Sequence, residues 1–358
     1  MRLDDRARRA ADGIRRAMGT PDTVDPFYRY ERRRRRNQRI GAGVLAAALV
    51  VAATYAIVRA FEHSRKPVPA GPTQPSGLIL YGEYIASRGQ LHLFTVDADG
   101  SGVRDLSIVT SCAQWLPDGS KILISNDAAF KAGGPPLRPA TINPDGSGLR
   151  PLDGAPNRDL NLGCGDVSPD GTRIVLEGFN ENKRGLNGIY SVRASDGGGL
   201  VRLTHNPYNT GDGYPQYSPD GTKVAFMRTK PGVNPDGAGA VFDVNADGTG
   251  LRRITPWGAA FLGQSWSPNG GWILFQRPYG RLYVVHPNGT ALHEIPLRLP
   301  VGAGAISPAW SPDGHWIVFS LERNAQADIF IVRADGSGLR RVTHAPGVET
   351  DPDWRPRE

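Results

Sequence analysis

The 358-residue sequence contains only two cysteines, and charged residues make up 22% of it. Two cysteines are too few for a disulfide-stapled miniprotein or for a cysteine-rich zinc or iron–sulfur site. The seven histidines show no H-E-x-x-H or other metal-ligand spacing, and the G-x-S-x-G motif of serine hydrolases is missing. We therefore expect no catalytic residues, no bound metal and no cofactor, and a protein that is not an enzyme.

A net positive charge is also absent from most of the chain. The net charge of +7 divides into +9 for residues 1–66 and −2 for residues 67–358. A protein that binds nucleic acid needs a basic surface to neutralise phosphates, and the larger part of this chain offers none. We expect no nucleic-acid partner.

Long apolar runs are limited to one, the nineteen uncharged residues Ile40–Val58. At 1.5 Å per residue they span roughly 28 Å, the thickness of the hydrocarbon core of a bilayer. The arginine cluster Arg32–Arg36 precedes the run and places that side in the cytoplasm. We predict a single transmembrane helix over 40–61 that contacts membrane lipid, with the C-terminal part outside the cytoplasm. A cleaved signal peptide and a buried core helix are the alternatives.

The predicted helix divides the chain into regions of different composition. Residues 1–39 form a basic cytoplasmic segment, in which residues 1–30 hold a short amphipathic helical pattern. That pattern fits either a membrane-surface helix or a docking segment for a cytoplasmic partner. Residues 62–76 are rich in proline and read as an exposed linker. The remaining residues, 77–358, form the large domain.

Two short motifs alternate strictly along the large domain, with six copies of each. The first is a Ser-Pro-Asp-Gly-like turn followed by an apolar strand, and its prolines are Pro117, Pro169, Pro219, Pro268, Pro312 and Pro356. The second is an apolar strand followed by an Asp-Gly-x-Gly-like turn, beginning at Asp99, Asp145, Asp196, Asp247, Asn288 and Asp335. Such turns join short antiparallel strands, because Pro presets φ and Gly tolerates a positive φ.

Four short strands per repeat of roughly 40–50 residues is the pattern of a β-propeller blade. The C-terminal segment TDPDWRP supplies an innermost strand only, and the first repeat supplies the other three strands. Joining the two completes a sixth blade. We therefore predict an all-β fold, a six-bladed β-propeller over residues 77–358 that is closed by one shared blade.

The paired SPDG and DGSG motifs over about 76–358 resemble those of the TolB-like, WD-type propellers with PD repeats found in bacterial envelope proteins. The resemblance implies a propeller that binds proteins or other ligands, without implying a chemistry. The soluble periplasmic members of that family have an extra N-terminal α/β domain. This chain has the predicted membrane helix in its place.

The loops of the predicted propeller separate into two rims. The short, uniform motif turns open on one rim, and the longer, irregular loops open on the other. Diverse loops on a rigid scaffold commonly carry recognition. Because the linker enters at the uniform rim, we expect the irregular rim to face away from the membrane. The candidate partner-binding residues there are Arg158, Asp159, Asn182, Arg184, Tyr208, Asp212, Tyr214, Trp257, Phe261, Arg323, Glu349 and Asp351.

The two cysteines occupy equivalent places in neighbouring repeats. Cys112 and Cys164 each lie five residues before the motif proline of their repeat. An exported domain allows their oxidation, so they form either a disulfide or two buried free thiols.

These features favour a membrane-anchored, extracytoplasmic propeller that binds a protein or cell-wall glycan without catalysis. A transmembrane sensor is the alternative, in which the propeller signals through the anchor to a cytoplasmic regulator such as a sigma factor. A propeller-type hydrolase is a second alternative that rests on fold analogy alone.

Overall fold

The computed structural model describes residues 75–85, 90–125, 136–155, 159–208, 211–229, 239–260 and 263–356. The chain separates into two compact units, Met1–Gly71 and Pro72–Glu358, and every described residue belongs to the second. The predicted cytoplasmic segment and transmembrane helix therefore lie outside the described residues. Within the described ranges, no helix is long and apolar enough to span a bilayer.

Strands make up almost all the regular structure of the described residues, with one 3-10 helix, η2 (Arg184–Leu186). Four sheets have four strands each: β4 (Ala113–Trp115), β5 (Ile122–Ser125), β6 (Pro139–Ile142), β7 (Arg150–Pro151); β8 (Asn161–Val167), β9 (Arg173–Phe179), β10 (Gly188–Arg193), β11 (Val201–Arg202); β12 (Asp212–Tyr217), β13 (Lys223–Arg228), β14 (Ala240–Asn245), β15 (Arg252–Arg253); and β16 (Gln264–Trp266), β17 (Ile273–Arg277), β18 (Arg281–Val285), β19 (His293–Glu294).

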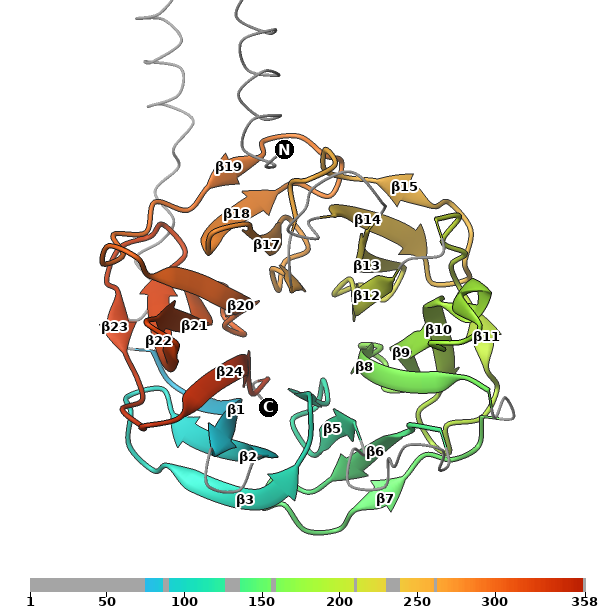
Figure 1. Ribbon diagram of the computed structural model, residues 1–358, viewed down its shortest axis with the longest axis horizontal. Helices are drawn as coiled ribbons and strands as arrows, with labels where there is room; N and C mark the ends of the chain where they lie inside the picture. The colour runs from blue at the N-terminus through green and yellow to red at the C-terminus, as the bar shows by residue number, and fades with distance from the viewer. Residues whose placement is uncertain are drawn as a thin grey trace, which may run out of the picture. The chain divides into compact units, whose positions relative to one another are not determined.

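The remaining eight strands belong to a fifth sheet made of two four-stranded groups. One group is β20 (Gly304–Trp310), β21 (Trp316–Arg323), β22 (Gln326–Arg333) and β23 (Arg340–Arg341). The other is β24 (Val348–Trp354), β1 (Leu78–Ile85), β2 (Gln90–Asp97) and β3 (Arg104–Val109). A single parallel pair, Ala327 with Val348, joins the two groups. Figure 1 shows the groups arranged radially around a central space, with β3, β7, β11, β15, β19 and β23 outermost.

The turn motifs form the local structure that their residues predict. In one SPDG turn, Ser168 Oγ donates to Asp170 Oδ1 over 2.6 Å and accepts the backbone N–H of Arg173 over 2.9 Å. The same carboxylate accepts the N–H of Thr172. Gly171 takes φ +70, which the turn needs and which an L side chain rarely adopts. These hydrogen bonds lower the pKa of Asp170 below its usual value.

Strand β24 pairs with β1 in antiparallel register, from Ile79 opposite Trp354 to Tyr84 opposite Val348. The two ends of the domain therefore share one four-stranded group, which we call the closing blade (β24, β1, β2 and β3). Trp354 is 3% exposed, and its indole Nε1 donates to the carbonyl of Ser76 over 3.1 Å. The pairing places the segment after the linker beside the C-terminal strand.

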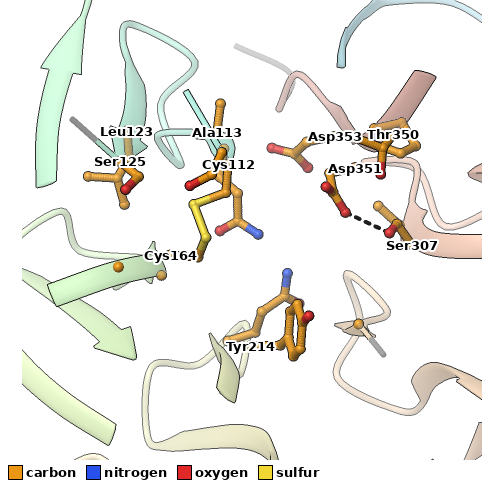
Figure 2. A pocket seen from close by; sticks show the side chains of 18 of the residues that line it. Cys112, Ala113, Leu123, Ser125, Cys164, Tyr214, Ser307, Thr350, Asp351 and Asp353 are labelled. Carbon is orange, nitrogen blue, oxygen red and sulfur yellow. Dashed lines mark hydrogen bonds between the residues drawn. A yellow bond between two sulfur atoms is a disulfide. The ribbon is translucent and has the colours of Figure 1, made fainter. Parts of the chain in front are cut away.

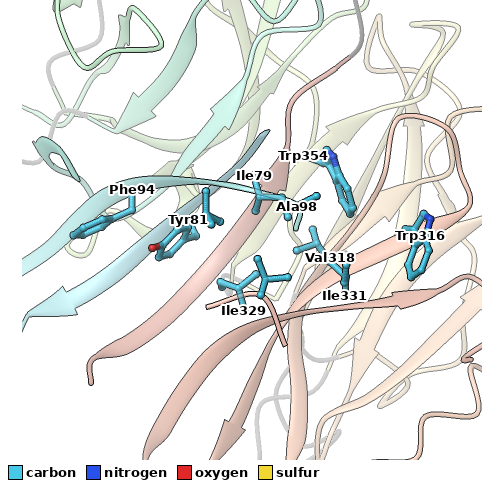
Figure 3. Close-up of a cluster of buried hydrophobic side chains, with 11 residues drawn as sticks. Ile79, Tyr81, Phe94, Ala98, Trp316, Val318, Ile329, Ile331 and Trp354 are labelled. Carbon is cyan, nitrogen blue, oxygen red and sulfur yellow. The ribbon is translucent and has the colours of Figure 1, made fainter. Parts of the chain in front are cut away.

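The hydrophobic core lies between successive groups of strands. The described residues contain six buried clusters, and each combines side chains from two neighbouring groups. Figure 3 shows the cluster at the closing blade, where Ile79, Tyr81 and Trp354 face Trp316 and Ile329 of the preceding group. Burial of large apolar side chains on this scale is the main stabilising term of such a domain.

Candidate functional site

A cavity of about 310 Å³ lies where the inner strands of all six groups meet. Its walls come from β4, β8, β12, β16, β20 and β24, from residues immediately before β4 and β16, and from Leu123–Ser125 of β5. Two aspartates, Asp351 and Asp353, line it, and the described lining contains no lysine, arginine or histidine. The cavity therefore presents carboxylates, amides, hydroxyls and backbone groups to a ligand.

One position of the repeat contributes a lining residue from every group. These residues lie five places before the motif proline, and they are Cys112, Cys164, Tyr214, Gly263, Ser307 and Asp351. We call this set the mouth ring. Figure 2 shows all of its side-chain-bearing members around one shared space.

Three members of the mouth ring have a left-handed backbone although they are not glycine. The φ angles are +55 for Tyr214, +49 for Ser307 and +49 for Asp351, and the ladder of each strand shifts register at that point. Such conformations cost of order 1–3 kcal/mol each and collect at functional sites. Because the left-handed backbone recurs at the one repeat position that forms the mouth ring, we infer that it shapes the wall of the cavity.

Two contacts tie neighbouring inner strands together at the mouth ring. Cys112 and Cys164 form a disulfide, and the described residues contain no free cysteine. Ser307 Oγ donates to Asp351 Oδ1 over 2.6 Å. The sequence did not decide between a disulfide and two buried free thiols. The structure contains the disulfide.

A second repeat position, three residues before the motif proline, joins successive inner strands by hydrogen bonds. Asp166 Oδ2 accepts the backbone N–H of Tyr217, and Asp353 Oδ2 accepts that of Trp115, each over 2.8 Å. Burial raises the pKa of Asp166 to about 7 and that of Asp353 to about 6, although these hydrogen bonds oppose the shift. These half-buried carboxyl groups therefore ionise at a cost to the folded state.

We expect the unfolding free energy of the chain to be larger near pH 5 than near pH 8, by roughly 1–3 kcal/mol. A carboxyl group whose pKa is raised in the folded state favours folding fully below its ordinary pKa of 3.8. That contribution is lost as the pH rises through about 6 to 7. Turn aspartates such as Asp145 have lowered pKa values, so their stabilising contribution is lost only in more acidic solution.

Urea unfolding of the full-length chain at pH 5, 6, 7 and 8 measures this dependence. Asp166→Asn should flatten the profile, because it removes one half-buried group that must ionise. A wild-type chain that is equally stable at pH 5 and pH 8 would contradict the prediction.

The structure places the predicted partner-binding residues in several separate locations. Tyr214 and Asp351 belong to the mouth ring. Tyr208 packs edge-to-face on Trp257, with ring centroids 6.0 Å apart. Asp159, Asn182 and Arg184 are exposed, while Arg158 and Phe261 lie outside the described residues.

Two of the predicted residues are not on the surface. Asp212 is 1% exposed and binds Arg228 through both carboxylate oxygens, over 2.7 and 2.6 Å. Glu349 is 0% exposed and accepts the backbone N–H of Ile329 over 2.9 Å. Both occupy the same repeat position, seven residues before the motif proline, as the first residue of β12 and the second residue of β24. They are corrected here from surface residues to buried structural residues.

Arg323 lines a different depression, a groove of about 780 Å³ between the β16–β19 sheet and the β20–β23 group. Tyr279, which also lines it, is 87% exposed, and nearby Val301 is 94% exposed. Ile306 lines both this groove and the central cavity, whereas Tyr279 and Arg323 line the groove alone.

The sequence prediction missed several lining residues of the cavity. Ser307 and Asp353 were overlooked, as were the amides Gln114, Gln216 and Gln264. Counting back from each motif proline was the signal that could have found them, because it places all five three to five residues before that proline.

No family model matches the chain. The Tol-Pal system protein TolB of Anaeromyxobacter dehalogenans is 33% identical over 124 residues, which are 34% of this chain and 25% of that protein. The matched segment thus spans a quarter of that relative. The crystal structure of TolB from Acinetobacter baumannii covers 80% of this chain and 68% of its own, with a TM-score of 0.62 and 18% identity.

The fold is also shared by a protein of another kind. Hydrazine synthase of Kuenenia stuttgartiensis aligns over 78% of this chain and 46% of its own, with a TM-score of 0.61 and 14% identity. At such identities the likeness shows the fold alone. Together with the repeat motifs and the radial sheets, the matches show that the described part of the chain has an all-β propeller fold similar to that of TolB.

Proposed function

We propose that this chain is a membrane-anchored, extracytoplasmic propeller of six blades that binds a protein partner without catalysing a reaction. The β24–β1 ladder supports a ring closed by one shared blade. The apolar run Ile40–Val58 and the preceding arginines support the anchor and its orientation in the cytoplasmic membrane. A cell-wall glycan is the other ligand class that an extracytoplasmic rim could meet.

The central cavity is the observation that carries the proposal. At the mouth ring it receives one residue from each of the six groups, and four of these, Tyr214, Gly263, Ser307 and Asp351, hold a left-handed backbone. Tyr214 is 39% exposed there, and Asp351 is exposed beside it. Aromatic side chains at the centre of a concave site are typical anchors of protein interfaces.

The name of the sequence relative supports a protein partner. That relative is named a Tol-Pal system protein. We propose by analogy that this chain also contacts a protein of the cell envelope through the rim that surrounds the mouth ring.

The double variant Tyr214→Asn/Asp351→Asn tests the proposal. Asparagine tolerates a positive φ, so the fold should be kept while the aromatic ring and the charge are lost. We expect recovery of the partner from cross-linked membranes to fall at least tenfold, which corresponds to about 1.4 kcal/mol.

Tyr279→Ala is the matched control, because Tyr279 is an exposed aromatic residue that lines the groove but not the central cavity. It should leave both the recovery and the thermal midpoint unchanged. Equal recovery with the wild type and the double variant, at equal stability, would exclude the mouth ring as the binding site.

A further inference from the structure

A lateral row of three ionisable side chains crosses the closing blade. His92 on β2 lies opposite Glu83 on β1, and Glu83 lies opposite Glu349 on β24. Residues directly opposite in antiparallel strands point to the same face, with Cβ atoms about 5 Å apart. The three are 7%, 9% and 0% exposed, respectively. The seam between the two ends of the domain therefore contains two facing, buried carboxyl groups.

The equivalent position in another blade shows what is unusual about this pair. Asp212 and Glu349 both lie seven residues before their motif proline. The residue opposite Asp212 is Arg228, which binds it as an ion pair. The residue opposite Glu349 is Glu83. The closing blade thus has a second acid where the β12–β15 sheet has a base.

The described groups that contact Glu349 do not supply the positive charge that Arg228 supplies to Asp212. Its Oε2 accepts hydrogen bonds from the Ile329 N–H and the Thr343 hydroxyl, while its Oε1 has no hydrogen-bond partner among the described residues. On β22, Asp328 adds negative charge, and Arg341 pairs with Asp328 over 2.6 Å.

Three further ionisable side chains, Asp105, His92 and Tyr81, interact electrostatically with one or both of the acids. The charge of Asp105 on β3 opposes the ionisation of Glu83, whereas His92 favours it. Tyr81 on β1 is neutral and buried close to both acids. Burial is the largest cause that raises the pKa of Glu349, to about 7, and it also raises the pKa of Glu83.

We propose that the seam between β1 and β24 is a pH-sensitive latch, firmly closed while the Glu83–Glu349 pair holds a proton and loosened when both carboxyl groups ionise. Two facing carboxylates in a buried site repel each other and lack compensating solvent. The contribution of Glu349 to closure is complete below pH 4.5 and is lost as the pH rises through about 7.

Release of β24 would also change the cavity, because Thr350, Asp351 and Asp353 of this strand form part of its wall. The latch itself is independent of which partner the cavity binds. It couples the pH outside the membrane to the closure of the ring.

Amide hydrogen exchange of the full-length chain in detergent tests the latch. We expect the protection of β24, corrected for the intrinsic exchange rate, to fall at least tenfold more than that of β13 between pH 5.5 and pH 8. Asp353 also lies on β24 and also has a raised pKa, so a loss of protection in the wild type does not by itself show which acid causes it. Glu349→Gln keeps the shape and removes the charge, and it should abolish most of the extra loss.

Glu83→Arg supplies the ion pair that Asp212 and Arg228 form in the other blade, and it should abolish the loss as well. Glu83→Gln serves the same purpose if the arginine variant does not fold. Glu177→Gln is the matched control, because Glu177 is a half-buried acid on β9 whose pKa is also raised to about 7. It should leave the loss at β24 unchanged. Equal protection of wild-type β24 at both pH values, or a full loss in Glu349→Gln, would overturn the latch.

Discussion

A chain that ends at Pro346, and so lacks β24, is expected to lose cooperative thermal unfolding. The truncation exposes the whole edge of β1, opens the core cluster around Trp354 and removes the acceptor of the Trp115 N–H. Loss of one buried tryptophan side chain costs about 3–5 kcal/mol, against a net stability of about 5–15 kcal/mol for a domain. Near-UV circular dichroism of the full-length and truncated chains during heating measures the effect.

Trp354→Ala gives a graded version of the same experiment. We expect it to lower the unfolding free energy by about 3–5 kcal/mol, whereas the exposed Tyr279→Ala should change it by less than about 0.5 kcal/mol. A truncated chain that unfolds cooperatively at the wild-type midpoint would show that β24 is dispensable and that the ends of the domain need not share a blade.

Replacing both cysteines, as Cys112→Ser/Cys164→Ser, is expected to lower the unfolding free energy by about 2–4 kcal/mol. The disulfide closes a loop with a sequence separation of 52 residues, and so restricts the unfolded chain. It also ties β8 to the start of β4, two inner strands that share no ladder of hydrogen bonds. Denaturant unfolding under non-reducing conditions, with both chains at the same pH, measures the loss.

Reduction provides the control for the cysteine variant. A reducing agent should bring the wild-type chain to the stability of the double variant and leave the double variant unchanged. If both thiols of the untreated wild-type chain can be alkylated, the bond is absent in solution and the expected loss disappears.

The repeats determine the strands of this protein because turn chemistry is local. Within one turn, the side chain of Ser168 donates a hydrogen bond to Asp170, and Gly171 takes the positive φ that the turn requires. The motif therefore specifies a hairpin wherever it occurs. The same periodicity indicated that the C-terminal segment would supply a missing inner strand, and β24 pairs with β1. The all-β propeller fold could be predicted on these grounds.

The positions of individual side chains depended on contacts between repeats. Asp212 and Glu349 follow irregular segments and therefore resembled surface residues, but neighbouring strands bury both. Conversely, Ser307 lies within an inner strand, and a local change to a left-handed backbone directs this part of the strand toward the cavity.

The sequence by itself determined the repeated turns, the number of strands in a repeat and the candidate anchor, since each depends on residues close together in the chain. Only the tertiary structure decided that Cys112 meets Cys164 and that Glu83 faces Glu349, residues 52 and 266 positions apart. Side chains from different repeats come together through strand register and ring geometry, which no local pattern encodes.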